Sequence, residues 1–299
     1  ILLVGRLISL VLNFVVQVLT VRYLAKSDYG AFAYALSVVS MGASVALFGL
    51  DKAVARFIPI YEERRQYGQM FGTMLLSLGT VVGIGVAMVA IFIGARGLIS
   101  GRFITDPLAV TLLVIMIALA PTQALDSWFQ GLFAVFAKPQ AIFFRRHVLG
   151  PGLKLLAVLL VMLTRSNVFW LGAGYLIGGL LGIATYVVLL VQVLKSKGLW
   201  TQFNPHEIKW PTREVFGFSI PLLTSDAMNI LKSNMVVILL EYFATTVQVA
   251  EFQAVWPVAR LNLFVMQSFK YLFTPLAARL FARDDMEGVN DLYWKTATW

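Results

Sequence analysis

Polar side chains recur at helical spacing inside long apolar stretches of this sequence, where a membrane would make them costly to keep. At about 100° per residue, the first stretch gathers its polar residues within a sector of roughly 80°. These residues are Arg6, Ser9, Asn13, Gln17 and Thr20. One polar stripe on an otherwise apolar helix indicates a helix that faces a hydrated interior or polar neighbours.

Three later stretches repeat the pattern, each within a sector of roughly 60–80° or on a row seven residues apart. Their polar residues are Gln123, Asp126 and Gln130; Ser219, Asp226, Asn229 and Ser233; and Gln253, Arg260, Gln267 and Thr274. Four such helices predict a shared polar cavity. The alternative is that these groups only hydrogen-bond between helices and hold them together. For Arg260, near the middle of its stretch, we expect a functional role.

The deep charges are mostly basic. The cations are Arg6, Lys154, Lys232, Arg260 and Lys270, and the acids are Asp126 and Asp226. A pathway for cationic drugs should be acidic, whereas this balance suits an anionic cargo. Arg and Lys bind phosphate or diphosphate groups by charge-assisted hydrogen bonds.

Motifs of soluble enzymes are missing from the sequence, which has no GxSxG, GxxxxGK or HExxH. Cysteine is absent, which excludes thiolate metal sites and cysteine catalysis. The two histidines, His147 and His206, lie far apart in the sequence. We therefore expect no enzyme activity, no metal and no cofactor.

The composition defines the elements that position these residues. The chain of 299 residues is 59% hydrophobic and 13% charged, against about 25% charged in a soluble domain. With a mean hydropathy of +0.81, it is predicted to be an all-α polytopic membrane protein and not a nucleic-acid binder. Its apolar runs cover 1–21, 30–50, 71–95, 108–136, 148–163, 168–194, 216–243 and 249–280. They predict eight membrane helices, and a ninth helix is expected to begin near Leu292.

The run of polar residues after the sixth helix, with Pro205 and Pro211, predicts a boundary between two bundles. We expect a six-helix bundle over residues 1–195, a cytoplasmic linker over 196–215, and a partial, truncated second bundle over 216–299. Glycines four apart, at Gly174, Gly178 and Gly182 and at Gly79 and Gly83, are typical of close helix packing.

Basic residues fix the expected orientation, because cytoplasmic loops are enriched in Lys and Arg. With a cytoplasmic N-terminus, the inner loops hold fourteen of them, including Lys52 and Arg145, and the outer loops hold five. Those five are Arg22, Lys26, Arg96, Arg102 and Arg165. We predict a multi-pass protein of the cytoplasmic (inner) membrane with its N-terminus inside.

Several segments, in order along the chain, resemble the Wzx-type polysaccharide (O-antigen and teichoic acid) flippases. They are residues 21–33, with Arg22, Asp28, Tyr29 and Gly30; 49–51; 55–59; 129–131; 218–222; and 254–275. That family belongs to the multidrug/oligosaccharidyl-lipid/polysaccharide exporter superfamily. The resemblance implies two helical bundles around a central cavity, and transport of lipid-linked glycans by alternating access.

The resemblance also implies roles for particular residues. Arg22 and Arg260 stand where related peptidoglycan-lipid flippases use cavity arginines. Many relatives carry a charged residue in the seventh helix where this chain has Val236 and Val237. An ion-coupling role for that position is therefore not carried over.

The leading hypothesis is a flippase for undecaprenyl-diphosphate-linked oligosaccharide. Its expected partners are the lipid bilayer, the lipid-linked anionic glycan, a coupling proton or sodium ion, and glycan assembly machinery. The expected cavity residues are Arg260, Arg22, Arg6, Asn13, Gln17, Asp126, Asp226, Lys154, Gln253, Gln267 and Lys270. The alternatives are a cation-coupled multidrug exporter of the same superfamily and a non-transporting scaffold of a glycan assembly complex.

Overall fold

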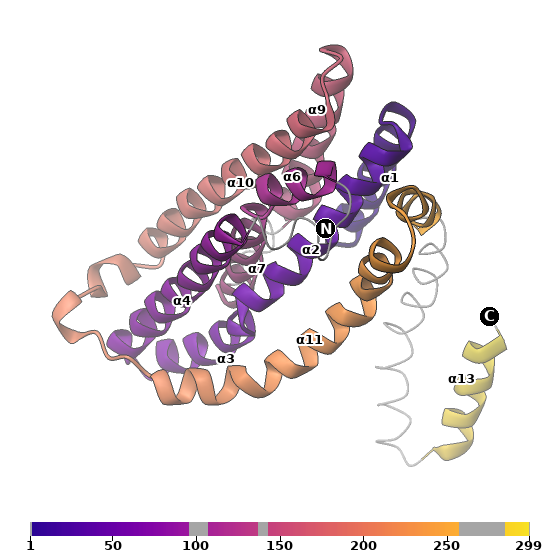
Figure 1. The fold of residues 1–299 in the computed structure, drawn as a ribbon. Coiled ribbons are helices and arrows are strands. Elements are labelled where there is room, and N and C mark those ends of the chain that lie inside the picture. Colours follow the sequence, from indigo (N-terminus) through magenta and orange to yellow (C-terminus); the bar gives the residue numbers. More distant parts are fainter. Residues whose placement is uncertain (1, 96–106, 137–142, 257–284, 299) are drawn as a thin grey trace. The chain divides into compact units, whose positions relative to one another are not determined.

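The computed structural model describes residues 2–95, 107–136, 143–256 and 285–298, and these residues form helices and short connections without a β-strand (Figure 1). The predicted all-α class is confirmed. The chain forms two compact units, Ile1–Glu251 and Phe252–Trp299. The helices of the first unit are α1 (Leu2–Tyr23), α2 (Lys26–Leu47), α3 (Leu50–Glu63), α4 (Tyr67–Gly94), α6 (Pro107–Met116), α7 (Leu119–Val135), η1 (Phe143–Leu149), α9 (Gly150–Leu163), α10 (Val168–Ser196), η2 (Leu199–Gln202), η3 (Pro205–Glu207) and α11 (Thr212–Phe243). A helix also begins at residue 246 and its described part ends at 256, and α13 (Met286–Thr298) lies in the second unit.

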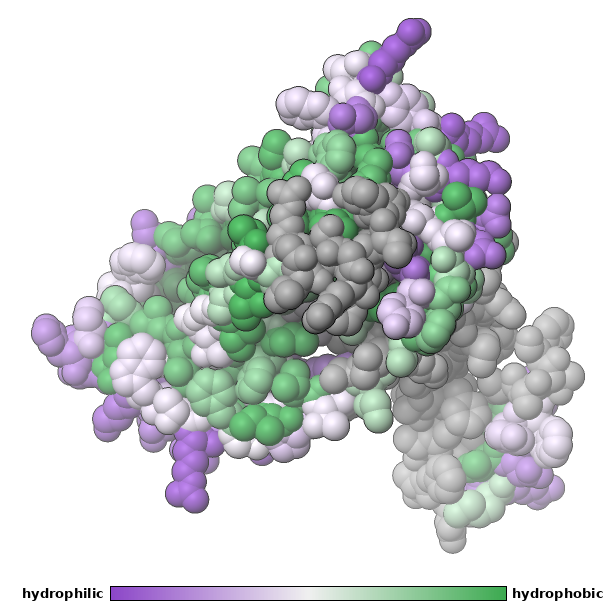
Figure 2. All heavy atoms as spheres, viewed as in Figure 1, coloured by the Kyte–Doolittle hydropathy of each residue, from purple (hydrophilic) through white to green (hydrophobic). Residues whose placement is uncertain are grey.

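Five helical segments among the described residues are long and apolar enough to cross a membrane. They are Lys26–Glu63, Tyr67–Gly94, Leu108–Val135, Phe143–Leu163 and Val168–Ser196, and Leu7–Tyr23 and Asn234–Phe243 are shorter apolar helices. On the face shown in Figure 2, apolar side chains cover the middle of the first unit and hydrophilic side chains gather at its ends. The chain is therefore a multi-pass membrane protein, while the count of eight spans and the start of a ninth stays a prediction.

The segment expected to be a loop after the second apolar run is instead the helix α3. Phe48 and Gly49 adopt left-handed conformations, with φ of 54° and 68°, and these separate α3 from α2. Glycine suits this position because a Cβ at Gly49 would lie 3.2 Å from the carbonyl oxygen of Ser219. The buried residues of α3 recur at helical spacing, at Leu50, Ala53, Val54, Ile58 and Tyr61. The apolar face of α3 thus packs inward, and Lys52 and Arg56 belong to a helix.

The fourth apolar run is broken into α6 and α7. Pro121 has no amide N–H to donate to the carbonyl of Ile117, so a regular helix loses a hydrogen bond there. The amide of Ala120 instead donates to Ile117 at 2.9 Å. The break seats Pro121 against α4, where a Cβ at Gly85 would lie 2.5 Å from the Pro121 Cβ.

A hydrophobic core of described residues lies mainly among α3, α4, α7 and α10. Trp128 is buried there, and its indole N–H donates to Ser77 at 2.9 Å. The indole of Trp128 thus finds its hydrogen-bond partner inside the core and not at a membrane interface. Four other large aromatic residues are exposed: Trp170, Trp200, Trp210 and Tyr242.

The polar segment between α10 and α11 lies against the start of α4. The amide of Lys209 donates to the carbonyl of Gly68 at 3.2 Å, and Phe203 packs edge-on against Phe71. From there α11 runs along α2 and α3. The compact units divide between Glu251 and Phe252, and not within residues 196–215. The boundary between two membrane bundles over residues 196–215 therefore stays a prediction.

Candidate functional site

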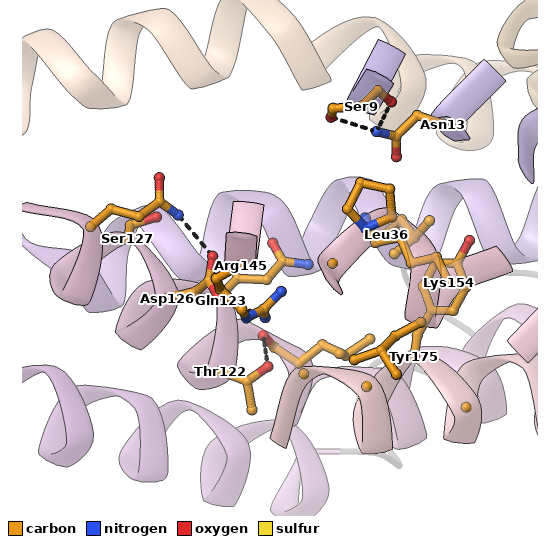
Figure 3. Close-up of a pocket in the computed structure, with 18 residues that line it drawn as sticks. Ser9, Asn13, Leu36, Thr122, Gln123, Asp126, Ser127, Arg145, Lys154 and Tyr175 are labelled. Atoms are coloured by element: carbon orange, nitrogen blue, oxygen red, sulfur yellow. Dashed lines mark hydrogen bonds and ion pairs between the residues drawn. The ribbon is translucent and has the colours of Figure 1, made fainter. Parts of the chain in front are cut away.

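A polar cavity of about 420 Å³ lies inside the first unit, among α1, α2, α7, η1, α9 and α10 (Figure 3). It is lined by Ser9, Asn13, Leu36, Leu119, Thr122, Gln123, Asp126, Ser127, Gln130, Arg145, Gly150, Pro151, Leu153, Lys154, Gly174, Tyr175, Gly178 and Gly179. Its volume is typical of small-molecule sites, which span about 300–1,000 Å³. The charged lining residues are two cations and one carboxylate, so the lining carries a net positive charge.

A buried ion pair joins two walls of this cavity. The Nη2 atom of Arg145 lies 2.7 Å from Oδ1 of Asp126, and the Gln130 side chain donates to Oδ2 of Asp126 at 2.8 Å. Arg145 is only 7% exposed. Because both carboxylate oxygens are engaged, Asp126 holds Arg145 in a fixed position.

A π-helical turn, η1, positions Arg145. Pro151 follows the turn and has no amide N–H to donate to the carbonyl of His147, so a regular α-helix cannot pass through this point unchanged. A π-turn inserts an extra residue and changes the direction in which side chains point. The sequence around Gly150 and Pro151 therefore explains how Arg145 comes to line the cavity.

Glycines of α10 shape the opposite wall. A Cβ at Gly182 would overlap the guanidinium of Arg145, so a larger residue there would have to displace this side chain. Gly174 and Gly178 face Ala157 and Leu153 of α9, which fits the expected close helix packing.

For Gly79 and Gly83 on α4 the same expectation stays a prediction. No atom of the described residues lies within 4 Å of a Cβ built at either position. Among the described residues, glycine spacing therefore coincides with a helix contact on α10 and not on this face of α4.

Lys154 reaches the cavity from α9, one turn beyond Pro151. Its ammonium lies 5.6 Å from the centre of the Tyr175 ring, within the range of a cation–π contact. Among the residues that the structure describes, no carboxylate forms an ion pair with Lys154. Its charge is therefore exposed to the cavity.

The structure brings three of the predicted site residues together around this cavity: Asn13, Asp126 and Lys154. Figure 3 shows Asn13 and Ser9 lying apart from the adjacent side chains of Asp126 and Arg145. The amide of Asn13 donates to the Ser9 carbonyl at 2.6 Å. Whether these residues bind a substrate stays a prediction.

Other predicted site residues lie elsewhere. Gln17 donates to the Tyr29 hydroxyl, and Arg22 is exposed in the last turn of α1. Asp226 of α11 lies 2.5 Å from Lys52 of α3, away from the cavity lining. The two acids expected to share one interior are therefore separate, each paired with its own cation.

The remaining predicted residues are not placed at this site. Gln253 lies in the second unit. The side chain of Arg6 lies outside the described residues, as do Arg260, Gln267 and Lys270.

Sequence reasoning missed Arg145 and Tyr175 as cavity residues. Arg145 precedes a Gly-Pro-Gly sequence at the start of the fifth apolar run. This helix-breaking sequence indicates an irregular turn, and such a turn could have pointed to Arg145 as an inward-facing residue. Tyr175 gave no such signal, because aromatic residues are common throughout the apolar runs.

The site is thus a cationic polar cavity enclosed by the helices of the first unit. A family model described as "Polysaccharide biosynthesis protein" matches residues 1–270, so the chain belongs to the polysaccharide biosynthesis protein family. The predicted family resemblance is thereby confirmed. No curated protein matches the chain.

The fold is similar to that of a multidrug resistance MATE family transporter of the MOP superfamily, solved in an inward-facing conformation. The TM-score is 0.76 at 15% sequence identity, which shows likeness of fold alone. The match covers 97% of this chain and 66% of that transporter. The chain thus spans just under two thirds of the length of the structure it matches.

Proposed function

We propose that the protein is a flippase that moves a lipid-linked anionic oligosaccharide, carried on undecaprenyl diphosphate, across the cytoplasmic membrane. The polysaccharide biosynthesis family and the MOP-type fold support membrane transport in glycan export. The observation that supports an anionic cargo is the charge balance of the cavity, which is lined by two cations, Arg145 and Lys154, and one carboxylate, Asp126. A pathway built for cationic drugs would place acids in excess.

Transport proceeds by alternating access between the two predicted bundles, with a proton or sodium ion as the coupling ion. Glycan assembly enzymes at the same membrane would supply the cargo. The predicted cavity residues, with Arg260 foremost, contact the cargo along its path.

The test uses a strain that lacks its own flippase and expresses this protein at normal abundance. We expect surface polysaccharide to reappear and the lipid-linked intermediate on the cytoplasmic face to fall, with ethidium efflux unchanged. Faster ethidium efflux without polysaccharide export would favour the drug exporter. Export that falls only in step with abundance in cavity variants would favour the scaffold.

A further inference from the structure

The segment that connects α10 to α11 carries uncompensated positive charge at one end of the first unit (Figure 1). Residues 195–213, here called the linker surface, hold four cations and one carboxylate: Lys195, Lys197, Lys209, Arg213 and Glu207. Lys197 pairs with Glu62 at 3.1 Å, and Glu214, the next acid along the chain, accepts a hydrogen bond from Tyr61 at 2.5 Å. No carboxylate of the described residues lies within ion-pair distance of the other three cations.

Three aromatic side chains of the linker surface are exposed beside these cations. Trp200 is 49% exposed, Phe203 41% and Trp210 55%. The ammonium of Lys195 lies 5.9 Å from the centre of the Trp200 ring, within the range of a cation–π contact. Trp is enriched where a membrane meets water, because its ring is apolar and its N–H is polar. Cations and indoles together therefore suit the interface of a bilayer.

The linker surface docks on α4 at glycines that leave room for its backbone. The amide of Lys209 donates to the carbonyl of Gly68 at 3.2 Å, and a Cβ at Gly72 would overlap the carbonyl of Lys209. Gly79 and Gly83, seven and eleven residues after Gly72, continue the same face of α4. No described atom lies within 4 Å of a Cβ at either of them. The linker surface thus covers the start of a face that is otherwise open among the described residues.

The position of the linker surface along α4 sets its depth in a membrane. α4 has 28 residues, about 42 Å at 1.5 Å per residue, whereas the hydrocarbon core of a bilayer is about 30 Å thick. The first turns of α4, on which the linker surface docks, therefore extend into the head-group layer. α10 is similarly long, with 29 residues, and ends at Ser196 within the linker surface. Both helices bring this surface to the level of lipid head groups.

We propose that the linker surface binds anionic phospholipids through Lys195, Lys209 and Arg213, with the indoles of Trp200 and Trp210 between head groups and acyl chains. Lys and Arg reach the phosphate layer while their stems stay on the apolar side, and an anionic bilayer surface attracts such clusters. A zwitterionic lipid would leave the three cations without net counter-charge. The inference goes beyond the proposed function, because the ligand is a lipid of the bilayer and not the cargo.

The charge is tested in nanodiscs of phosphatidylcholine with a rising fraction of phosphatidylglycerol, at constant ionic strength. We expect the unfolding temperature of the purified wild type to rise saturably with that fraction. In Lys195→Gln with Lys209→Gln, the fraction needed for half the effect should rise roughly tenfold or more, since each cation near an anionic surface contributes about a factor of five. Arg165→Gln with Lys295→Gln removes equal charge from exposed cations elsewhere and should respond as the wild type does.

Gly72→Ala tests the docked position without removing a charge. The added methyl group displaces the linker surface from α4, so the response to phosphatidylglycerol should weaken as it does in the double lysine variant. Gly79→Ala, on the same face of α4, is the matched control because its Cβ meets no described atom. A wild-type lipid response in Gly72→Ala would overturn the docked arrangement on which the proposal depends.

The indoles are tested with phosphatidylcholine brominated high in its acyl chains, which quenches Trp emission at the interface. The quenched part of the emission should fall in Trp200→Phe and in Trp210→Phe, and it should stay unchanged in Trp128→Phe, whose indole is buried in the core.

Three results would overturn the proposal. If Trp200 and Trp210 are not quenched and the wild type unfolds at the same temperature in both lipids, the linker surface is left to an acidic protein partner. If the Arg165→Gln, Lys295→Gln control loses as much of the lipid response as the double lysine variant, the response reflects net charge and not this surface. If the double lysine variant keeps the wild-type response, its cations do not bind the lipid.

Discussion

Carboxylates on the membrane helices of the first unit lie opposite cations from other helices. Asp126 of α7 pairs with Arg145 of η1, and Asp226 of α11 pairs with Lys52 of α3. Removing one partner of a buried pair leaves a charge without compensation, which costs far more than losing both. Lys154 differs, because no carboxylate of the described residues lies within ion-pair distance of it. Arg145 and Asp126, the more buried of the two pairs, are thus expected to matter first for folding, and Lys154 for binding.

The free energy of unfolding should distinguish the structural role of the Arg145–Asp126 ion pair from a role of the cavity in binding. Arg145→Ala is expected to destabilise the protein by about 3–5 kcal/mol, and adding Asp126→Asn should recover most of this loss. Thermal unfolding and membrane abundance measure the effect. Lys154→Ala serves as the control, and it should change stability little. An Arg145→Ala protein as stable as wild type would mean that the pair is not buried from solvent.

Arg260 stays a predicted cargo-binding residue. Asp126 and Asp226, the two deep acids of the sequence, are each paired with another cation. Arg260→Ala and Arg260→Glu should abolish export at normal abundance, because the cargo's phosphate loses its counter-charge. Arg260→Lys should keep partial export, since a point charge still attracts phosphate.

The readout is surface polysaccharide per molecule of protein in the membrane. If Asp126→Asn or Asp226→Asn restores export to Arg260→Ala, then Arg260 is part of a structural ion pair and does not bind cargo.

At the scale of elements, interruptions in the helices decide where side chains point. Pro121 separates α6 from α7, the left-handed residues Phe48 and Gly49 separate α2 from α3, and the π-turn η1 precedes α9. Each interruption coincides with a close approach or a buried polar group. Proline and glycine within apolar runs are therefore better guides to the site here than the apolar periodicity itself.

The contact of α4 with α7 depends on the absence of a side chain at Gly85. Gly85→Val should destabilise the protein by about 1–3 kcal/mol, because the added atoms overlap Pro121 and overpacked cores relax poorly. Gly83→Val, two residues earlier on α4, faces no described atom and should be tolerated. Unfolding temperatures of the two variants in the same detergent test this. Equal effects would indicate that valine harms α4 itself rather than its packing.

At the scale of the whole molecule, the face drawn in Figure 2 shows apolar side chains over the middle of the first unit and hydrophilic side chains at its ends. The ion pair Lys26–Glu251 joins the start of α2 to a segment more than 170 residues away in the sequence. The ion pair Lys52–Asp226 does the same for the start of α3. Such long-range pairs relate the first helices to the start of the predicted second bundle. The basic-residue distribution still carries the prediction of orientation.

Orientation is tested by reporter fusions after Arg65, Ser100, Arg146, Ser166 and Lys197. With a cytoplasmic N-terminus they should report inside, outside, inside, outside and inside, because inner loops retain the basic residues. Phosphatase and fluorescent-protein reporters give opposite signals and control for expression. Two adjacent fusions of the wrong sign would refute this topology.

The sequence by itself determined the helices and the polar stripes, because apolar content and helical spacing are properties of neighbouring residues. It placed Asn13, Gln123 and Asp126 on polar faces, and the structure turns those faces to one cavity. Sequence also carried the family resemblance, since its matching segments survive in order along the chain.

Only the tertiary structure decided which polar groups meet. It paired Asp226 with Lys52, 174 residues away, and it brought Arg145 to Asp126. It also buried Trp128 against Ser77, and it packed no described atom against a Cβ position at Gly83. The physical reason is that contacts between helices depend on how the helices cross and where they break. Those features follow from packing among residues distant in sequence, which no local pattern records.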